Sequence, residues 1–121
     1  MRPFEDDVRW EVSWLLRAGV PARGVRIAVR ELVVTHIGRG PLGAHEIEEA
    51  AAAAARAACR LVRELDAPPE VVDLVCGAAL DGVRGHGGWS AQWLEAATAA
   101  VATVVDDFTA EERGRAGDGR R

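Results

Sequence analysis

Residues 44–65 read AHEIEEAAAAAARAACRLVREL, and the segment closes on the sequence DAPP at 66–69. It contains no glycine or proline, carries acidic residues in its first turns and arginines in its last, and stops at two prolines. These are the start and stop signals of one α-helix whose charges complement the helix dipole. At 1.5 Å per residue this helix would be roughly 33 Å long, enough to cross a small domain.

The apolar residues of this segment recur every three or four positions along its whole length. Such a stripe is typical of a helix that buries one face against neighbouring helices. The stripe consists of Ile47, Ala51, Ala54, Ala58, Leu61 and Leu65, with Ala50 and Val62 beside it. The pattern predicts an all-α helical bundle and names the buried face of this helix, but it indicates no reaction.

Length and composition set broad limits on the class of protein. A chain of 121 residues, 49% hydrophobic and 28% charged, can form one domain with its own core. No apolar run approaches about 18 residues and the first residues are acidic, so we expect no membrane span, secretory signal or transit peptide. Cys59 and Cys76 fall within predicted helices without metal-ligand spacing, which favours reduced thiols and a cytoplasmic location.

The charge of the chain argues against one large class of partner. The formal net charge is −4, whereas a general nucleic-acid binder usually carries a basic face. Every basic residue is arginine, and lysine, asparagine and tyrosine are absent, a bias typical of a GC-rich bacterial genome. Arginine in this chain therefore does not by itself indicate phosphate recognition.

Glycine and proline divide the chain into five predicted helices. We expect these helices over about residues 4–18, 22–37, 44–65, 69–84 and 90–112. Residues 1–113 then form a single helical-bundle domain, and the glycine-rich segment 114–121 is expected to be a disordered tail. The helix over 69–84 is apolar nearly all round, which predicts a central position, and its Gly77 and Gly82 indicate close packing against a neighbour.

Two stretches of the chain, 25–65 and 71–111, resemble each other at an offset of 46 residues. Each reads as a shorter helix, a glycine-rich turn and a longer alanine-rich helix. Alanine richness also produces such matches by chance, so a true duplication stays open. Two helical hairpins packed together, with the first helix laid against them, is the economical architecture.

The first predicted helix is apolar on two sides. One stripe contains Phe4, Val8, Val12, Leu15 and Leu16, and Trp10 and Trp14 lie roughly opposite it at 100° per residue. One small bundle can bury only one face of a peripheral helix, so the tryptophans predict a contact surface for a partner or a second copy. The alternative is that this helix is enclosed within the fold, against Trp89 and Trp93.

The second predicted helix has the same two-sided character. Val25, Val29, Leu32, Val33 and His36 form one face, whereas Ile27 and Val34 lie on the other. Either this helix is central or the chain self-associates through it. The predicted interaction surface therefore comprises Trp10, Trp14, Arg17, Ile27 and Val34.

The polar residues give little support to catalysis or metal binding. No glutamate stands three residues before any histidine, as a carboxylate-bridged metal bundle would require, so we expect no metal and no cofactor. No serine, threonine or cysteine has an attributable base, and the acids near residues 106–112 are interpreted as a solvated helix end. The glycine turns at 38–40 and 84–88 could hold an anion, but their role as turns explains them. We therefore expect no enzymatic activity.

Two local resemblances bring further hypotheses. The segment HIGRG at 36–40, followed by LGA at 42–44, resembles the phosphoacceptor motif of histidine phosphotransfer domains, which are four-helix bundles. The resemblance implies that His36 would accept a phosphoryl group and that Arg39 would steady it. The arginine replaces the usual lysine, and Gly38 and Pro41 interrupt the helix. Residues 29–58 are similar to helical hairpins of uncharacterised bacterial alanine-rich proteins, which implies a fold but no activity.

Together the patterns predict a non-enzymatic helical subunit that binds protein or itself through its tryptophan-bearing helix. A phosphotransfer module that uses His36 is one alternative. An amphipathic coat for an apolar surface, as phasin-like alanine-rich helices would provide, is another, although the firm turns favour a closed fold.

Overall fold

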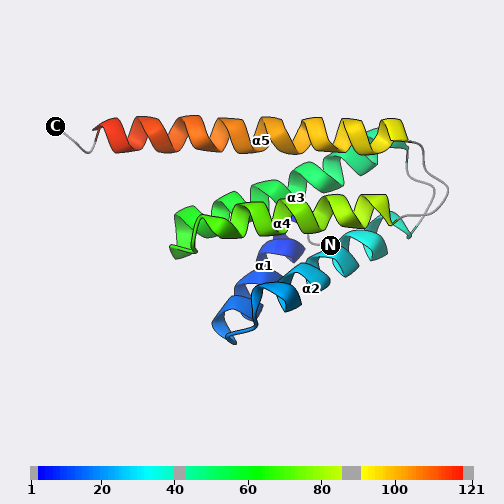
Figure 1. Cartoon of the computed structure of the whole chain (residues 1–121), viewed down its shortest axis with the longest axis horizontal. Helices are drawn as coiled ribbons and strands as arrows, with labels where there is room; N and C mark the ends of the chain where they lie inside the picture. Colours follow the sequence, from blue (N-terminus) through cyan, green and yellow to red (C-terminus); the bar gives the residue numbers. More distant parts are fainter. Residues whose placement is uncertain (1–2, 40–42, 86–90, 119–121) are drawn as a thin grey trace.

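The computed structural model describes residues 3–39, 43–85 and 91–118, with side chains described as far as Arg115. Within these ranges the chain forms helices and no strand (Figure 1). The helices are α1 (Phe4–Arg17), α2 (Ala22–Ile37), α3 (Ala44–Leu65), α4 (Glu70–Arg84) and α5 (Ala91–Asp118). The predicted all-α fold of five helices is confirmed.

Local chemistry ends the helices at the predicted breaks. After α1 the chain turns at Gly19, whose φ of +76° lies in the left-handed region that glycine adopts without strain. After α3, Asp66 takes a left-handed conformation and the N–H of Ala67 donates to the carbonyl of Leu61 at 3.3 Å. The two prolines that follow exclude a continuing helix, and α4 begins directly after them.

The helices form two layers. In Figure 1, α1, α3 and α5 run in one direction, and α2 and α4 run in the opposite direction. Within one layer α3 packs between α1 and α5, and within the other α2 packs against α4. The hairpins α2–α3 and α4–α5 therefore stack so that α2 lies against α4 and α3 lies against α5.

This stacking follows the sequence offset of 46 residues. The positions that correspond across the two hairpins are buried alike, at no more than 4% exposure: Val25 with Val71, Val29 with Val75, and Ala51 with Ala97. A duplicated hairpin would produce this arrangement of equivalent helices. The internal similarity is thus carried by core positions as well as by alanine content.

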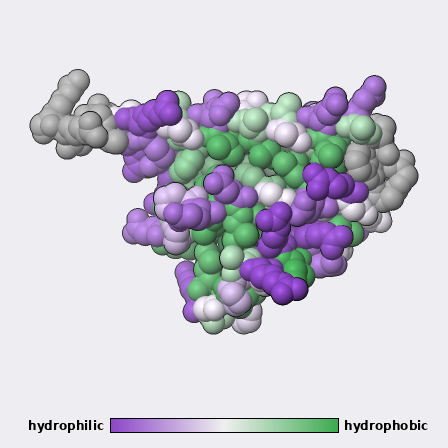
Figure 2. All heavy atoms as spheres, viewed as in Figure 1, coloured by the Kyte–Doolittle hydropathy of each residue, from purple (hydrophilic) through white to green (hydrophobic). Residues whose placement is uncertain are grey.

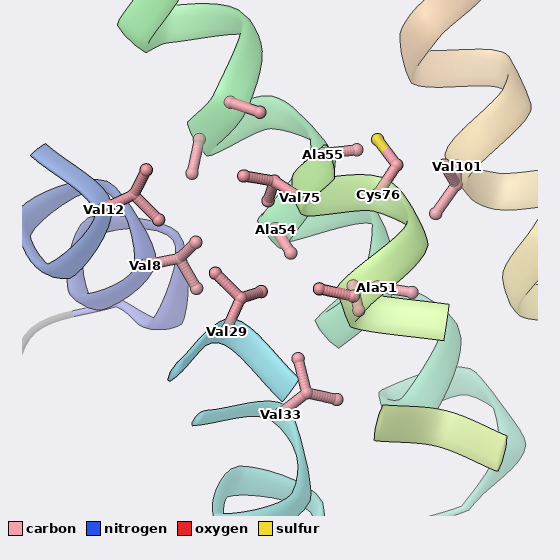
Figure 3. Packing of buried hydrophobic residues seen from close by; sticks show 14 of the residues in the cluster. Val8, Val12, Val29, Val33, Ala51, Ala54, Ala55, Val75, Cys76 and Val101 are labelled. Atoms are coloured by element: carbon pink, nitrogen blue, oxygen red, sulfur yellow. The ribbon is translucent and has the colours of Figure 1, made fainter. Parts of the chain in front are cut away.

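Helix α3, and not α4, is the central element, so that expectation was wrong. It packs against all four other helices, and its alanines from Ala50 to Ala55 are at most 6% exposed on every side of the helix. Figure 3 shows Ala54 among valines of α1, α2 and α4, and Ala55 beside Cys76 of α4. Helix α4 leaves Asp73 exposed and Leu74 and Leu80 only partly buried.

The ends of the two longest helices differ from expectation. Leu65, which the apolar stripe of α3 placed in the core, is 45% exposed because it stands at the last position of the helix. Helix α5 continues through Gly114 to Asp118, so the segment expected to be a tail from residue 114 begins as helix. Residues 119–121 lie outside the described part of the chain.

Helices α2 and α4 approach each other closely at Gly82 of α4. A Cβ atom placed on Gly82 would lie 2.8 Å from Cβ of Val33 and 3.1 Å from the carbonyl oxygen of Arg30. At Gly77 the nearest atom would be 3.6 Å away, in the flexible guanidinium of Arg26. Of the two glycines predicted to mark close packing, Gly82 is required by the close approach of the helices and Gly77 is not.

We expect Gly82→Ala and Gly77→Ala to change stability in opposite directions. The first forces α2 and α4 apart and lowers the free energy of unfolding by about 1–3 kcal/mol. The second fits ordinary contact and raises it by up to about 1 kcal/mol, because alanine favours helix. Urea unfolding followed by circular dichroism measures both, and equal stabilities would contradict the close approach.

Candidate interaction surface

The outward face of α1 carries two exposed tryptophans. Trp10 is 62% exposed and Trp14 is 59% exposed, whereas Val8 and Val12, on the opposite side of the same helix, are fully buried. Tryptophan side chains rarely remain so exposed without a role in contact. The two-sided character predicted for this helix is present in the structure.

The arrangement of the helices explains this exposure. Among the described elements, α1 packs against α2 and α3 alone and forms the edge of its layer. Trp93 belongs to α5 at the far edge of that layer, where it packs partly buried on the core, and does not meet α1. Trp89 lies outside the described residues. Enclosure of α1 against Trp93 is therefore not observed.

The other residues of the predicted surface divide by exposure. Arg17, one turn beyond Trp14, is exposed, and no salt bridge within the described part of the chain involves it. Ile27 on α2 is 54% exposed, but Val34 is partly buried. Neither Ile27 nor Val34 lines the groove between α1 and α2. Its α2 wall is formed by Ala28, Glu31, Leu32, Thr35 and His36.

Salt bridges from α3 brace the first turns of α1. Glu5 accepts hydrogen bonds from Arg56 at 2.7 Å and from Arg60 at 3.0 Å, and Asp6 lies 3.2 Å from the same Arg60. Burial by itself raises the pKa of Glu5, but the hydrogen bonds and charges of the two arginines outweigh it and lower that pKa. Farther along, Arg9 lies 3.7 Å from Glu64. The tryptophans thus stand on a helix fixed at several points.

A second group of charges joins α3 to α5. Arg63 donates to Glu112 at 3.2 Å, pairs with Glu111, and lies 4.9 Å from the ring centre of Phe108. The acids of this segment were expected to be solvated, and the side chains of Glu111 and Glu112 remain 59% and 40% exposed while they pair with Arg63. Sequence spacing gave no signal of it, because Arg63 and the two acids are 48 and 49 positions apart.

His36, the residue in the phosphoacceptor resemblance, stacks on Phe4 at the end of α2. The ring centres are 4.1 Å apart and the planes differ by 15°. Burial and the neighbouring Arg39 lower the pKa of His36, so the imidazole is neutral at pH 7. Helix α2 ends at Ile37, and Arg39 is exposed beyond it. The open groove beside the ring, of about 310 Å³, also contains Asp7, Glu11 and Glu31.

A second groove, of about 550 Å³, lies between the first turns of α1 and α3. His36 and His45 stand on its walls with the carboxylates of Glu46 and Glu49. Across the described residues, however, no three histidine, cysteine or acidic side chains are placed to hold a metal ion. None of the described helices has the length and apolarity needed to cross a membrane. The glycine turns at 38–40 and 84–88 extend outside the described part.

Both cysteines are free and buried in the interior of the bundle. Burial raises the pKa of the Cys59 thiol, and burial together with the nearby Cys59 and Asp73 raises the pKa of Cys76 to about 12. Neither thiol forms a thiolate near neutral pH, and a thiolate is what nucleophilic chemistry requires. The cysteines act as small core residues.

A scan against protein-family models, a search of curated proteins and a search of solved structures gave no match to this chain.

We expect Glu5→Gln to loosen α1 in a pH-dependent way. Because the folded pKa of Glu5 is lowered, its stabilisation is present above the ordinary glutamate pKa of about 4.3 and is lost as the pH falls through the folded value. The variant should unfold with about 1 kcal/mol less free energy at pH 7, and its difference from the wild type should shrink as the pH falls below about 4.3. Glu31→Gln, at an exposed position of α2, is the control. The hypothesis fails if both variants have the same free energy of unfolding at pH 7.

We also expect both thiols to resist modification in the folded protein. A disulfide reagent at pH 8 should modify neither cysteine on the timescale in which it titrates both after unfolding in guanidinium, because burial suppresses the thiolate. Absorbance of the released thiol measures the rates. Rapid native modification of Cys76 would show that the interior at α4 opens readily.

Proposed function

We propose that this protein is a non-enzymatic helical subunit that self-associates through the outward face of α1. The observation that carries the proposal is the pair Trp10 and Trp14, each about 60% exposed on a helix held by salt bridges. Exposed aromatic residues on a rigid element lose little conformational entropy on binding, and tryptophan is enriched among the residues that dominate binding energy.

The rest of the molecule is consistent with a binding role. The described residues contain neither a metal-binding cluster nor an activated thiol, and the net charge of −4 opposes a nucleic-acid partner. We further propose that the subunit acts in the cytoplasm, where buried free cysteines stay reduced. Arg17 and the exposed Ile27 would lie at the edge of the contact.

The phosphotransfer alternative finds less support. A phosphoacceptor must project into solvent, whereas one face of the His36 ring lies against Phe4. A phosphoryl group in the adjacent groove would also stand among Asp7, Glu11 and Glu31, whose charges repel it. Acid-labile phosphate on His36 after incubation with a phosphorylated receiver domain would restore this alternative.

The coat alternative requires the helices to open onto an apolar surface. The stacked hairpins instead bury the apolar faces of α2, α3 and α4 against one another, as Figure 3 illustrates for their valines and alanines. Figure 2 shows additional hydrophobic surface along α5 on the face viewed there. Unfolding that becomes cooperative only when lipid is added would favour the coat.

The test of self-association compares the wild type with Trp10→Ala/Trp14→Ala. Sedimentation equilibrium up to about 100 μM should give a mass above that of a monomer for the wild type and a monomer for the variant. Because both rings are mainly exposed, the variant should keep its helical circular dichroism. Leu65→Ala removes another exposed apolar side chain, 45% exposed on α3, and should leave the mass unchanged. A monomeric wild type over this range would contradict the proposal.

A further inference from the structure

A groove lies beside the tryptophans of α1, where the last turns of α1 meet the end of α3. Its volume is about 510 Å³, within the range of pockets that take a ligand. The groove has apolar walls and one charge of each sign, supplied by Leu16, Leu61, Leu65, Pro68, Arg17 and Asp66.

The two charged residues of the groove narrow the chemistry of its occupant. Arg17 and Asp66 are exposed, and no salt bridge within the described part of the chain involves either. A carboxylate in the groove would be attracted by the arginine but repelled by the aspartate, and an amine would meet the reverse. An indole suits both, because a guanidinium stacks on its ring face and a carboxylate accepts a hydrogen bond from its N–H. The groove therefore fits a tryptophan side chain.

The chain presents such a side chain next to the groove. Trp14 is 59% exposed and does not line the groove of its own copy. At 100° per residue, Arg17 stands between Trp14 and the groove-lining Ser13 around the circumference of α1. The ring and the groove thus lie on either side of the outward face, within the same turn of α1. A two-fold axis through this face carries each ring to the groove of the other copy.

We propose that Trp14 of each copy inserts into the groove of a second copy, so that the two copies complete each other's sites. The proposal rests on the self-association proposed above and adds the pocket into which the tryptophan docks. In this arrangement Arg17 lies over the ring of the partner's Trp14, and Asp66 accepts a hydrogen bond from its N–H. Trp10, one turn away, lies at the periphery of the contact.

The size of this contact sets the expected strength of the dimer. Two inserted indoles, with the groove walls that they cover, would bury on the order of 500 Å². This lies below the roughly 1,200 Å² of stable specific interfaces, so the dimer belongs with weak and transient complexes. We expect a dissociation constant in the micromolar range, in which a few residues supply most of the binding energy.

Two single substitutions remove the two halves of the contact. Trp14→Ala removes the ring, and Leu65→Arg puts a charged side chain into the groove beside Arg17. Each should weaken the dimer at least about thirtyfold in sedimentation equilibrium, because every insertion is lost in either homodimer. Trp10→Ala should weaken it by no more than about fivefold. Arginine is favourable in the last turn of a helix, so Leu65→Arg should fold, as circular dichroism checks.

An equimolar mixture of Trp14→Ala and Leu65→Arg provides a sharper test. The first chain keeps an open groove and the second keeps its ring, so their heterodimer recovers one of the two insertions. Native mass spectrometry separates the heterodimer from both homodimers, because the two chains differ in mass. We expect heterodimers at concentrations where each variant alone is a monomer.

Two further variants control for side effects of the substitutions. Leu65→Ala keeps the wall apolar and should change the dissociation constant by no more than about threefold, so the mass at about 100 μM stays that of a dimer. Ala102→Arg adds the same charge at an exposed position of α5, which does not line the groove. It should leave the dissociation constant within about twofold of the wild type.

The outcomes separate insertion into the groove from self-association in general. A dimer that is lost in Trp10→Ala/Trp14→Ala but as stable in Leu65→Arg as in the wild type would overturn the insertion and leave the proposed function intact. A dimer that survives both tryptophan substitutions would overturn both. Heterodimers from two variants that are monomeric alone would support the insertion, and their absence would overturn it.

Discussion

The small side chains of α3 determine how the other four helices can pack. A helix that touches neighbours on every side must keep each contact short, and alanine allows helix axes to approach at the lower end of the usual 8–10 Å range. From Ala50 to Ala58 every residue is alanine except Arg56, whose guanidinium donates a hydrogen bond to Glu5 of α1. A larger residue at a fully buried position such as Ala54 or Ala57 would separate two helices at once. The two-layer arrangement in Figure 1 thus depends on this one segment.

The orientation of α1 follows from that arrangement. Once α3 is surrounded, the layer can only end at α1 on one side and at α5 on the other. An edge helix buries one stripe, here Val8, Val12 and Leu15, and leaves the opposite one to solvent. The ion pairs between Glu5 and the arginines of α3 then fix which stripe is outward. Exposure of Trp10 and Trp14 is therefore a consequence of the packing of the whole layer.

Much of this could be predicted from the sequence, and the reasons are local. Glycine and proline mark the helix breaks, and the stripe of α3 gave Ile47, Ala51, Ala54, Ala58 and Leu61 as core residues, all of them buried. The burial of Ala53, Ala55 and Ala57 could not be read from periodicity, since it depends on α5 covering a second face. Nor could the partners of Arg63, because ion pairs between distant segments leave no pattern in spacing. For the candidate surface, the two-sided pattern of the first helix predicted exposed tryptophans but left its enclosure within the fold as an alternative. The exposure of Trp10 and Trp14 and the partial burial of Val34 required the fold.

The edges of the layer have a consequence for larger assemblies. Because α1 and α5 border α3 on opposite sides, a dimer joined through α1 would carry its two α5 helices at opposite poles of an elongated particle. Each pole would present the 28-residue α5, of which Figure 2 shows a partly hydrophobic flank. Such a particle would be bivalent, with its two ends held at a fixed separation.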